Sequence, residues 1–182
     1  MPDSIPLLIL GLGNLLCTDD GLGAVAVASL MRHYHVPEDV VVLDGGTLGL
    51  ALLPYFQQAR TAIIVDAIRA DRPAGSFVRL EGAEVAPAVL NRLSVHQIGV
   101  ADLLDGARWL DRYPIRVILL GLVPETIELG VGCSRPVADA LPGLVRRIVT
   151  EARALGFELA PRSDDGPPVA AGRIDLPHVL GM

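Results

Sequence analysis

Short runs of apolar residues divide this chain, and most of them are continuous rather than alternating with polar residues. The continuous runs cover residues 6–11, 39–45, 61–67 and 115–122. Runs of this kind are typical of parallel strands that are covered by helices on both faces. A further run, residues 75–82, begins at a turn marked by Pro73 and Gly75. We expect this last run to form an antiparallel strand at the edge of the sheet.

Segments with apolar residues at helical spacing separate these strands. They cover residues 21–33, 48–59, 97–110 and 137–155. The first two have the length of crossover helices between parallel strands, and Gly156 suits the position that follows the last helix. The pattern therefore predicts a three-layer, doubly wound α/β fold. Its sheet should be mostly parallel, with an antiparallel edge strand and helices on both faces.

A single domain accounts for all of these elements. The chain has 182 residues, of which 51% are hydrophobic, and this is enough for one sizeable core. We assign residues 1–156 to a single α/β domain. Residues 157–182 are rich in Pro, Gly and Asp and show no helical or strand period, so we predict a mobile C-terminal tail.

The charge of the chain excludes several functions. There are 15 basic and 21 acidic residues, for a net charge of −6, so we expect no binding to nucleic acid or to anionic membranes. Every basic residue is Arg, which excludes Schiff-base and P-loop lysine chemistry. With Cys17 and Cys133 as the only cysteines, no signal-peptide pattern and no membrane-length apolar stretch, the sequence predicts a cytoplasmic protein without membrane insertion.

Polar residues follow the predicted parallel strands at their carboxyl ends, where open α/β sheets bind their ligands. Asp20 follows the first strand, Asp44 starts the Asp-Gly-Gly-Thr loop after the second, and Asp66 ends the third. His96 directly precedes the helix predicted over residues 97–110 and should reach the same edge of the sheet. We therefore expect these side chains to meet.

The first of these loops resembles a dinucleotide-binding turn without matching it. Gly11 and Gly13 follow a strand, but Leu16 stands where the third glycine is required. Asp19 and Asp20 occupy the start of the next helix, where a pyrophosphate would otherwise bind. Like charges at ~4 Å repel by roughly 4 kcal/mol at an effective dielectric constant of about 20. The loop therefore favours a cation over a phosphate.

Asp20, Asp66 and His96 together form a donor set that suits a divalent ion such as zinc, nickel or manganese. Structural roles stay open for each of them: a helix cap for Asp20, a turn former for Asp66 and a first-turn helical residue for His96. Ser94 lacks the GxSxG context of a nucleophile, and Cys17 lies beside acids, so we interpret both as structural residues. We expect Trp109 to be a core or interface residue.

Five segments between residues 7 and 156 resemble, in order, the sequence blocks of the nickel–iron hydrogenase maturation endopeptidases. They read GLGNLLCTDDGLG, DGGTLGLALL, IIVDAIRA, SVHQIGVADLL and LLGLVPETIELGVGCSRPV. The resemblance implies an α/β fold in which Asp20, Asp66 and His96 bind a metal ion. Many family members have Glu where Asp20 stands, and the tail after Gly156 departs from the family pattern.

The resemblance also implies an activity. Members of this family remove a C-terminal extension from the precursor of the hydrogenase large subunit after nickel has been inserted into it. The chain would then be a metal-dependent, aspartic-type endopeptidase whose nickel arrives with the precursor, and other divalent metals would fit the same site. The general base stays open between a metal-site carboxylate and Asp44. Two alternatives are a non-catalytic nickel-sensing maturation chaperone and a nucleotide-binding Rossmann-type enzyme.

Overall fold

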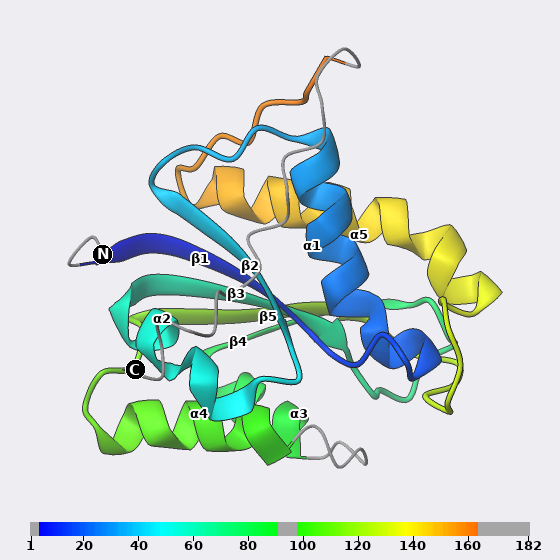
Figure 1. The fold of residues 1–182 in the computed structure, drawn as a ribbon, viewed down its shortest axis with the longest axis horizontal. Coiled ribbons are helices and arrows are strands. Elements are labelled where there is room, and N and C mark those ends of the chain that lie inside the picture. The colour runs from blue at the N-terminus through cyan, green and yellow to red at the C-terminus, as the bar shows by residue number, and fades with distance from the viewer. Residues whose placement is uncertain (1–3, 91–97, 164–182) are drawn as a thin grey trace, which may run out of the picture.

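In the described part of the chain the sheet has five strands, which are parallel except at one edge (Figure 1). A computed structural model describes residues 4–90 and 98–163 of the chain. The strand order is β2-β1-β3-β5-β4, in which β4 pairs antiparallel with β5 and all other neighbours are parallel. The strands are β1 (Ile5–Leu12), β2 (Val40–Gly46), β3 (Ala59–Ala67), β4 (Phe77–Glu81) and β5 (Arg116–Leu122).

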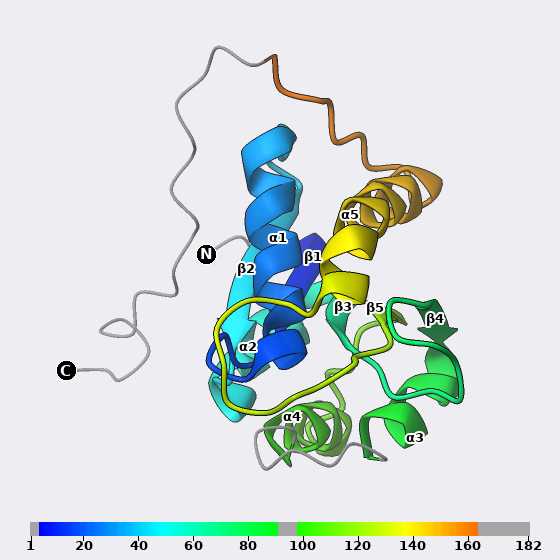
Figure 2. The ribbon, with the colours of Figure 1, turned by 90° about the vertical axis from the view of Figure 1, so that its right-hand side faces the viewer.

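Helices cover both faces of this sheet, as Figures 1 and 2 show. Helices α1 and α5 pack on one face, and α2, α3 and α4 pack on the other. The helices are α1 (Leu22–His33), α2 (Leu53–Gln58), α3 (Val85–Leu90), α4 (Ile98–Trp109) and α5 (Arg135–Ala154), with short 3₁₀ turns η1 (Thr18–Gly21), η2 (Gly49–Leu52) and η3 (Gly82–Glu84). None of the described helices is long and apolar enough to cross a membrane.

The continuous apolar runs arise because each inner strand supplies two cores. In β1, Leu7 and Ile9 point into the core beneath α1 and α5, while Leu8 and Leu10 point into the core on the opposite face. All four side chains are fully buried. Successive side chains of a strand point to opposite faces, so a strand buried on both faces has no polar positions. The predicted α/β fold class, including the antiparallel edge strand, is confirmed.

Other local predictions differ from the structure. The segment predicted as one helix over residues 48–59 divides into η2 and α2, with Pro54 in the first turn of α2. Proline lacks the N–H that a continuous helix would need at that position.

Helix α3 was not predicted, because its six residues are too few to show a helical period. Trp109 is 90% exposed at the end of α4, so it is not a core residue.

The packed chain continues beyond the domain boundary that the sequence predicts at Gly156. Leu159 is 1% exposed in the core beneath α1 and α5. The backbone of Ala160 accepts a hydrogen bond from His35, and the backbone N–H of Arg162 donates to His33. Residues 157–162 therefore belong to the domain. A single apolar residue that fills a gap next to a helix carries no periodic signal, which is why the sequence pattern missed it.

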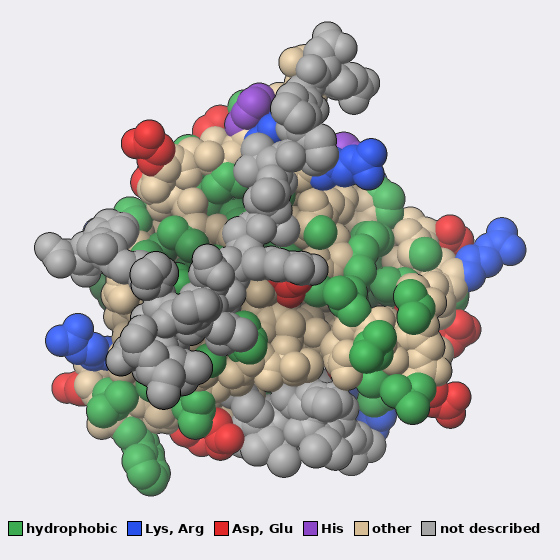
Figure 3. Space-filling view, in the orientation of Figure 1, with side chains coloured by type: hydrophobic (Ala, Val, Ile, Leu, Met, Phe, Trp, Pro, Cys, Tyr) green, Lys and Arg blue, Asp and Glu red, His purple; other side chains and the backbone are tan. Residues whose placement is uncertain are grey.

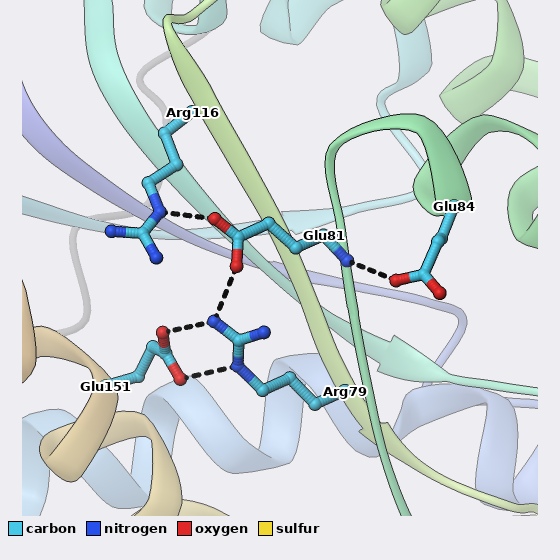
Figure 4. A network of polar contacts seen from close by, with 5 residues as sticks. All are labelled: Arg79, Glu81, Glu84, Arg116 and Glu151. Carbon is cyan, nitrogen blue, oxygen red and sulfur yellow. Dashed lines mark hydrogen bonds and ion pairs between the residues drawn. The ribbon is translucent and has the colours of Figure 1, made fainter.

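Edge strand β4 is tied to its neighbours by a network of charged side chains (Figure 4). Arg79 of β4 donates hydrogen bonds to both carboxylate oxygens of Glu151 on α5 and to Glu81. Glu81 also accepts a hydrogen bond from Arg116 of β5. These two glutamates raise the pKa of the Arg79 guanidinium. The network joins β4 to β5 and α5 and places charged groups along an edge strand.

Candidate active site

The strand order creates a switch point between β1 and β3. From β1 the chain crosses through α1 to β2 on one side, while β3 is the neighbour of β1 on the other side. Ligands of open α/β sheets bind at such a point, beyond the carboxyl ends of the strands. A small pocket lies there, lined by Leu12, Gly13, Asp20, Gly46, Thr47, Asp66 and Val100.

Asp20 reaches this pocket from the turn η1 that follows β1. Its side chain is 1% exposed, and its Oδ2 accepts a hydrogen bond from the backbone N–H of Asn14 at 2.9 Å. Gly13 makes this turn possible, because its φ is +117° and a Cβ at that position would overlap the carbonyl oxygen of Asp20. Gly13 thus allows the turn η1 to approach the end of β1 closely. This packing accounts for the glycine in the loop, and no bound phosphate is needed to explain it.

Asp66 reaches the same pocket from the carboxyl end of β3. It is 2% exposed, and its Oδ1 accepts a hydrogen bond from the N–H of Ala67 at 2.7 Å. In the sheet, Asp66 pairs with Gly121 of β5. A Cβ at Gly121 would overlap the carbonyl oxygen of Asp66, so only glycine lets the two strands keep this spacing here.

The two carboxylates give the pocket an acidic lining. Asp20 and Asp66 are both buried and line the same small pocket. Buried carboxylates need compensation by hydrogen bonds or positive charge, and their oxygen atoms are ligands for divalent metals. The third predicted ligand, His96, lies outside the described residues. Within residues 4–90 and 98–163, no group of three or more His, Cys, Asp or Glu side chains is placed to hold a metal ion.

Asp44 has a different position from the other candidates. It does not line the pocket, and its Oδ1 accepts a hydrogen bond from the N–H of Gly46 at 3.1 Å. This is the geometry of an Asp side chain that stabilises its own turn. Gly46 and Thr47 line the pocket in its place. The structure therefore favours a turn-forming role for Asp44.

Asp19 is the residue whose importance the sequence analysis missed. It is fully buried, and its carboxylate accepts hydrogen bonds from the N–H groups of Glu125, Thr126 and Ser134 and from the Ser134 hydroxyl. These donors lie on the irregular segment between β5 and α5. Asp19 thereby fixes that segment to η1. No local signal could have revealed this role, because the donors are more than one hundred residues away.

Both cysteines are half-buried free thiols. Cys133 is half-buried, and burial, followed by the charge of Asp19, raises the pKa of its thiol above the usual 9.0. Because the thiolate is the reactive form, a raised pKa makes Cys133 a poor candidate for a nucleophile. Cys17 is also half-buried and pairs with Gly130 in an isolated β-bridge. This arrangement is consistent with two packed thiols.

Sequence comparison identifies the class of protein to which this fold and pocket belong. The sequence model of the hydrogenase maturation protease family, HycI, matches residues 25–151. The chain belongs to this family and is a protease, which confirms the resemblance found in the sequence blocks. Family membership also favours the protease over a nucleotide-binding enzyme or a chaperone without catalytic activity.

Individual relatives place the chain within the family. It is 34% identical over 157 residues to the hydrogenase 2 maturation protease of Escherichia coli K12, covering 86% of this chain and 96% of that protein. It is 35% identical over 155 residues to the hydrogenase expression/formation protein HupD of Rhodobacter capsulatus, covering 84% and 73% of the two chains.

Solved structures show the same fold. The hydrogenase maturating endopeptidase HybD of E. coli superposes with a TM-score of 0.83 at 34% identity and covers 88% of this chain and 99% of that one. The [NiFe] hydrogenase maturation protease HybD of Thermococcus kodakarensis superposes with a TM-score of 0.66 at 28% identity, covering 81% and 99%. The similarity thus extends over nearly the whole length of both solved chains.

Proposed function

We propose that this protease removes a C-terminal extension from the precursor of a hydrogenase large subunit, and that it acts after nickel has been inserted. The observation that carries the proposal is the position of Asp20 and Asp66, two buried carboxylates that line one pocket at the switch point of the sheet. Such a pocket attracts a positive ion and rejects an anionic ligand.

In this proposal, nickel is part of the substrate. The precursor brings the ion into the pocket, where Asp20, Asp66 and His96 supply oxygen and nitrogen ligands. A precursor without nickel would place no positive charge between the two carboxylates and would lose that attraction. Recognition through the ion therefore makes cleavage conditional on loading. Other divalent ions suit the same donor set.

Cleavage of the peptide bond requires a base that removes a proton from water. Asp20 and Asp66 are the described carboxylates at the pocket, and either can accept this proton while the water oxygen attacks the scissile carbonyl carbon. The C–N bond then breaks, and the proton passes to the departing amine. The ion of the loaded precursor would polarise the carbonyl. Asp44 is disfavoured as the base because its carboxylate is turned to Gly46.

Incubation with purified precursor tests the proposal. The protease is mixed with nickel-loaded and nickel-free large-subunit precursor, and intact-mass spectrometry follows the length of the precursor. We expect the loaded precursor to shorten by a single C-terminal fragment and the nickel-free precursor to stay intact. Binding of the loaded precursor without shortening would favour the nickel-sensing chaperone instead. Equal cleavage of both forms would overturn recognition through nickel.

A further inference from the structure

Apolar side chains gather on the surface beside the pocket. Leu15 and Leu16 follow β1 and are 50% and 62% exposed, while Leu129 and Val131 follow β5 and are 87% and 88% exposed. We name these four residues the apolar rim. Figure 3 shows apolar side chains clustered on the right-hand side of the molecule, over the loops that follow β1 and β5. Contiguous exposed apolar surface on a folded protein marks an interaction site.

The two segments of the apolar rim are joined through their backbones. The N–H of Gly130 donates to the carbonyl oxygen of Leu16 at 2.9 Å, and the N–H of Thr18 donates to the carbonyl oxygen of Gly130 at 2.9 Å. These bonds bring Leu129 and Val131 next to Leu15 and Leu16 although more than one hundred residues separate them. Figure 2 shows the segment after β5 passing the loop after β1.

Polar side chains of the turn η1 hold the apolar rim in place. The Thr18 hydroxyl lies 2.9 Å from the carbonyl oxygen of Thr126 and 3.2 Å from that of Glu128. Asp19 fixes the same segment through its hydrogen bonds to Thr126 and Ser134. The exposed leucine and valine side chains are thus presented on an ordered backbone. A surface that is ordered before binding loses less conformational entropy when a partner docks.

Two residues of the apolar rim, Leu15 and Leu16, lie between Gly13 and Asp20 of the pocket lining. Asn14, which donates its N–H to Asp20, directly precedes Leu15. The backbone of Leu15 also lies against Gly21, because a Cβ at Gly21 would fall 2.9 Å from the Leu15 Cα. A chain that places an ion beside Asp20 would therefore lie near Leu15 and Leu16. The pocket itself is too small to recognise a whole protein, so the surface around it has to supply this contact.

We propose that the apolar rim is the docking surface for apolar side chains of the large-subunit precursor close to the scissile bond. This inference rests on the proposed function. The precursor is the partner that fits, because Leu15 and Leu16 stand on the same loop as the pocket residues Gly13 and Asp20, so a chain whose ion lies at Asp20 is brought next to them. The docking surface supplies affinity, while Asp20 and Asp66 supply the ion site and the chemistry.

The test compares two variants with equally exposed substitutions. The Leu129→Ser/Val131→Ser variant changes the apolar rim. Ile115→Ser is the control, because Ile115 is 82% exposed but lies at the amino end of β5, away from the pocket. The affinity for fluorescently labelled, nickel-loaded precursor and the rate of its shortening are both measured over a range of precursor concentrations. Thermal unfolding checks that each variant is folded.

We expect the apolar rim variant to bind the precursor about ten-fold more weakly, with a matching rise in KM and little change in kcat. The control should behave like the wild type. Unchanged affinity of the apolar rim variant, or equal weakening in the control, would overturn the docking surface. A wild-type dimer that the rim variant dissociates would assign the surface to self-association instead. If the wild type binds the precursor through the apolar rim without shortening it, the proposed cleavage fails while the docking surface stands.

Discussion

The carboxylate of Asp19 accepts hydrogen bonds from both the backbone N–H and the hydroxyl of Ser134, which lies 115 residues further along the chain. Ser134 immediately precedes α5, so this contact fixes the start of that helix next to η1. The neighbouring Asp20 instead faces the pocket. Two consecutive aspartates therefore have separate roles, one in holding loops together and one at the site.

Replacing Asp19 should destabilise the protein. The Asp19→Ala variant leaves the N–H groups of Glu125 and Ser134 without their acceptor, and a hydrogen bond to a charged group contributes about 1.5–3 kcal/mol. We expect the free energy of unfolding to fall by about 2–4 kcal/mol in urea titrations. The control, Asp139→Ala, removes an exposed acid near the start of α5. It should change the free energy of unfolding by less than about 0.5 kcal/mol. Equal stability of both variants would contradict the assigned role of Asp19.

Replacing the pocket carboxylates should affect activity far more than stability. The Asp20→Asn and Asp66→Asn variants keep the size of each side chain but remove its negative charge. We expect the rate of precursor shortening to fall by at least ~100-fold, because the proposed ion site and the proposed general base are both impaired. The melting temperature should fall only slightly, as circular dichroism can check. Normal shortening by both variants would show that the site assignment is wrong.

Gly121 should tolerate no side chain. In the Gly121→Ala variant the new Cβ would overlap the Asp66 carbonyl oxygen, so the strands must separate and Asp66 must shift. We expect a loss of about 1–3 kcal/mol of stability in urea titrations, together with slower precursor shortening. Gly143→Ala is the matched control, since its Cβ would meet only an Arg146 nitrogen at 3.9 Å. If Gly121→Ala behaves like this control, the close approach of β5 to Asp66 does not constrain the site.

The charged network on β4 should weaken in acid. Hydrogen bonds from Arg116 and then from Arg79 lower the pKa of Glu81 below its usual 4.5. A lowered folded-state pKa stabilises the protein above the unfolded value, and this stability is lost as the pH falls through the folded-state pKa. The contribution should stay below about 1 kcal/mol, because these side chains are about one third exposed and solvent screens them.

Glu81→Gln tests this dependence. The wild type should be more stable than the variant at pH 7, and the difference in urea titrations should shrink below pH ~4.5. Glu38→Gln removes an exposed acid that lies outside the network and serves as the control. A difference between the wild type and Glu81→Gln that is independent of pH would argue against a charged interaction.

Shortening the chain at two positions should test whether residues 157–162 belong to the folded domain. A chain that ends at Gly156 lacks Leu159, whose side chain is buried, and the backbone hydrogen bonds to His33 and His35. We expect it to lose about 2–3 kcal/mol of stability in urea titrations. A chain that ends at Ser163 keeps all of these contacts and should unfold like the full-length protein. Equal stability of the two shortened chains would refute the extended domain boundary.

The sheet could be predicted from sequence because burial on both faces leaves an unbroken apolar run. The strands around Leu8 and Ile63 show this signal strongly, and their helices have the lengths that parallel crossovers need. Part of the candidate site could also be inferred from sequence, because the carboxyl ends of parallel strands such as β1 and β3 lie at the same edge of the sheet. Asp20 and Asp66 were placed at one edge by this rule, and they line one pocket.

What the sequence could not provide depends on contacts between distant segments. Asp19 and Asp20 look equivalent in the sequence, and only the donors near Ser134 distinguish them. Asp44 resembles a site residue until its hydrogen bond to Gly46 is seen. Trp109 has a large apolar side chain of the kind found in protein cores, but its position at the end of α4 leaves it exposed to solvent. Periodicity describes one element at a time and therefore cannot resolve these cases.

The pairing of Pro161 with Tyr34 has a practical consequence for work with this enzyme. The described chain ends near the far end of α1, whereas the pocket lies at the opposite end of the sheet, next to the start of that helix (Figure 1). A purification handle or reporter domain attached behind Ser163 would start from the side remote from the pocket. Fusion proteins of this design should leave the approach to the pocket open.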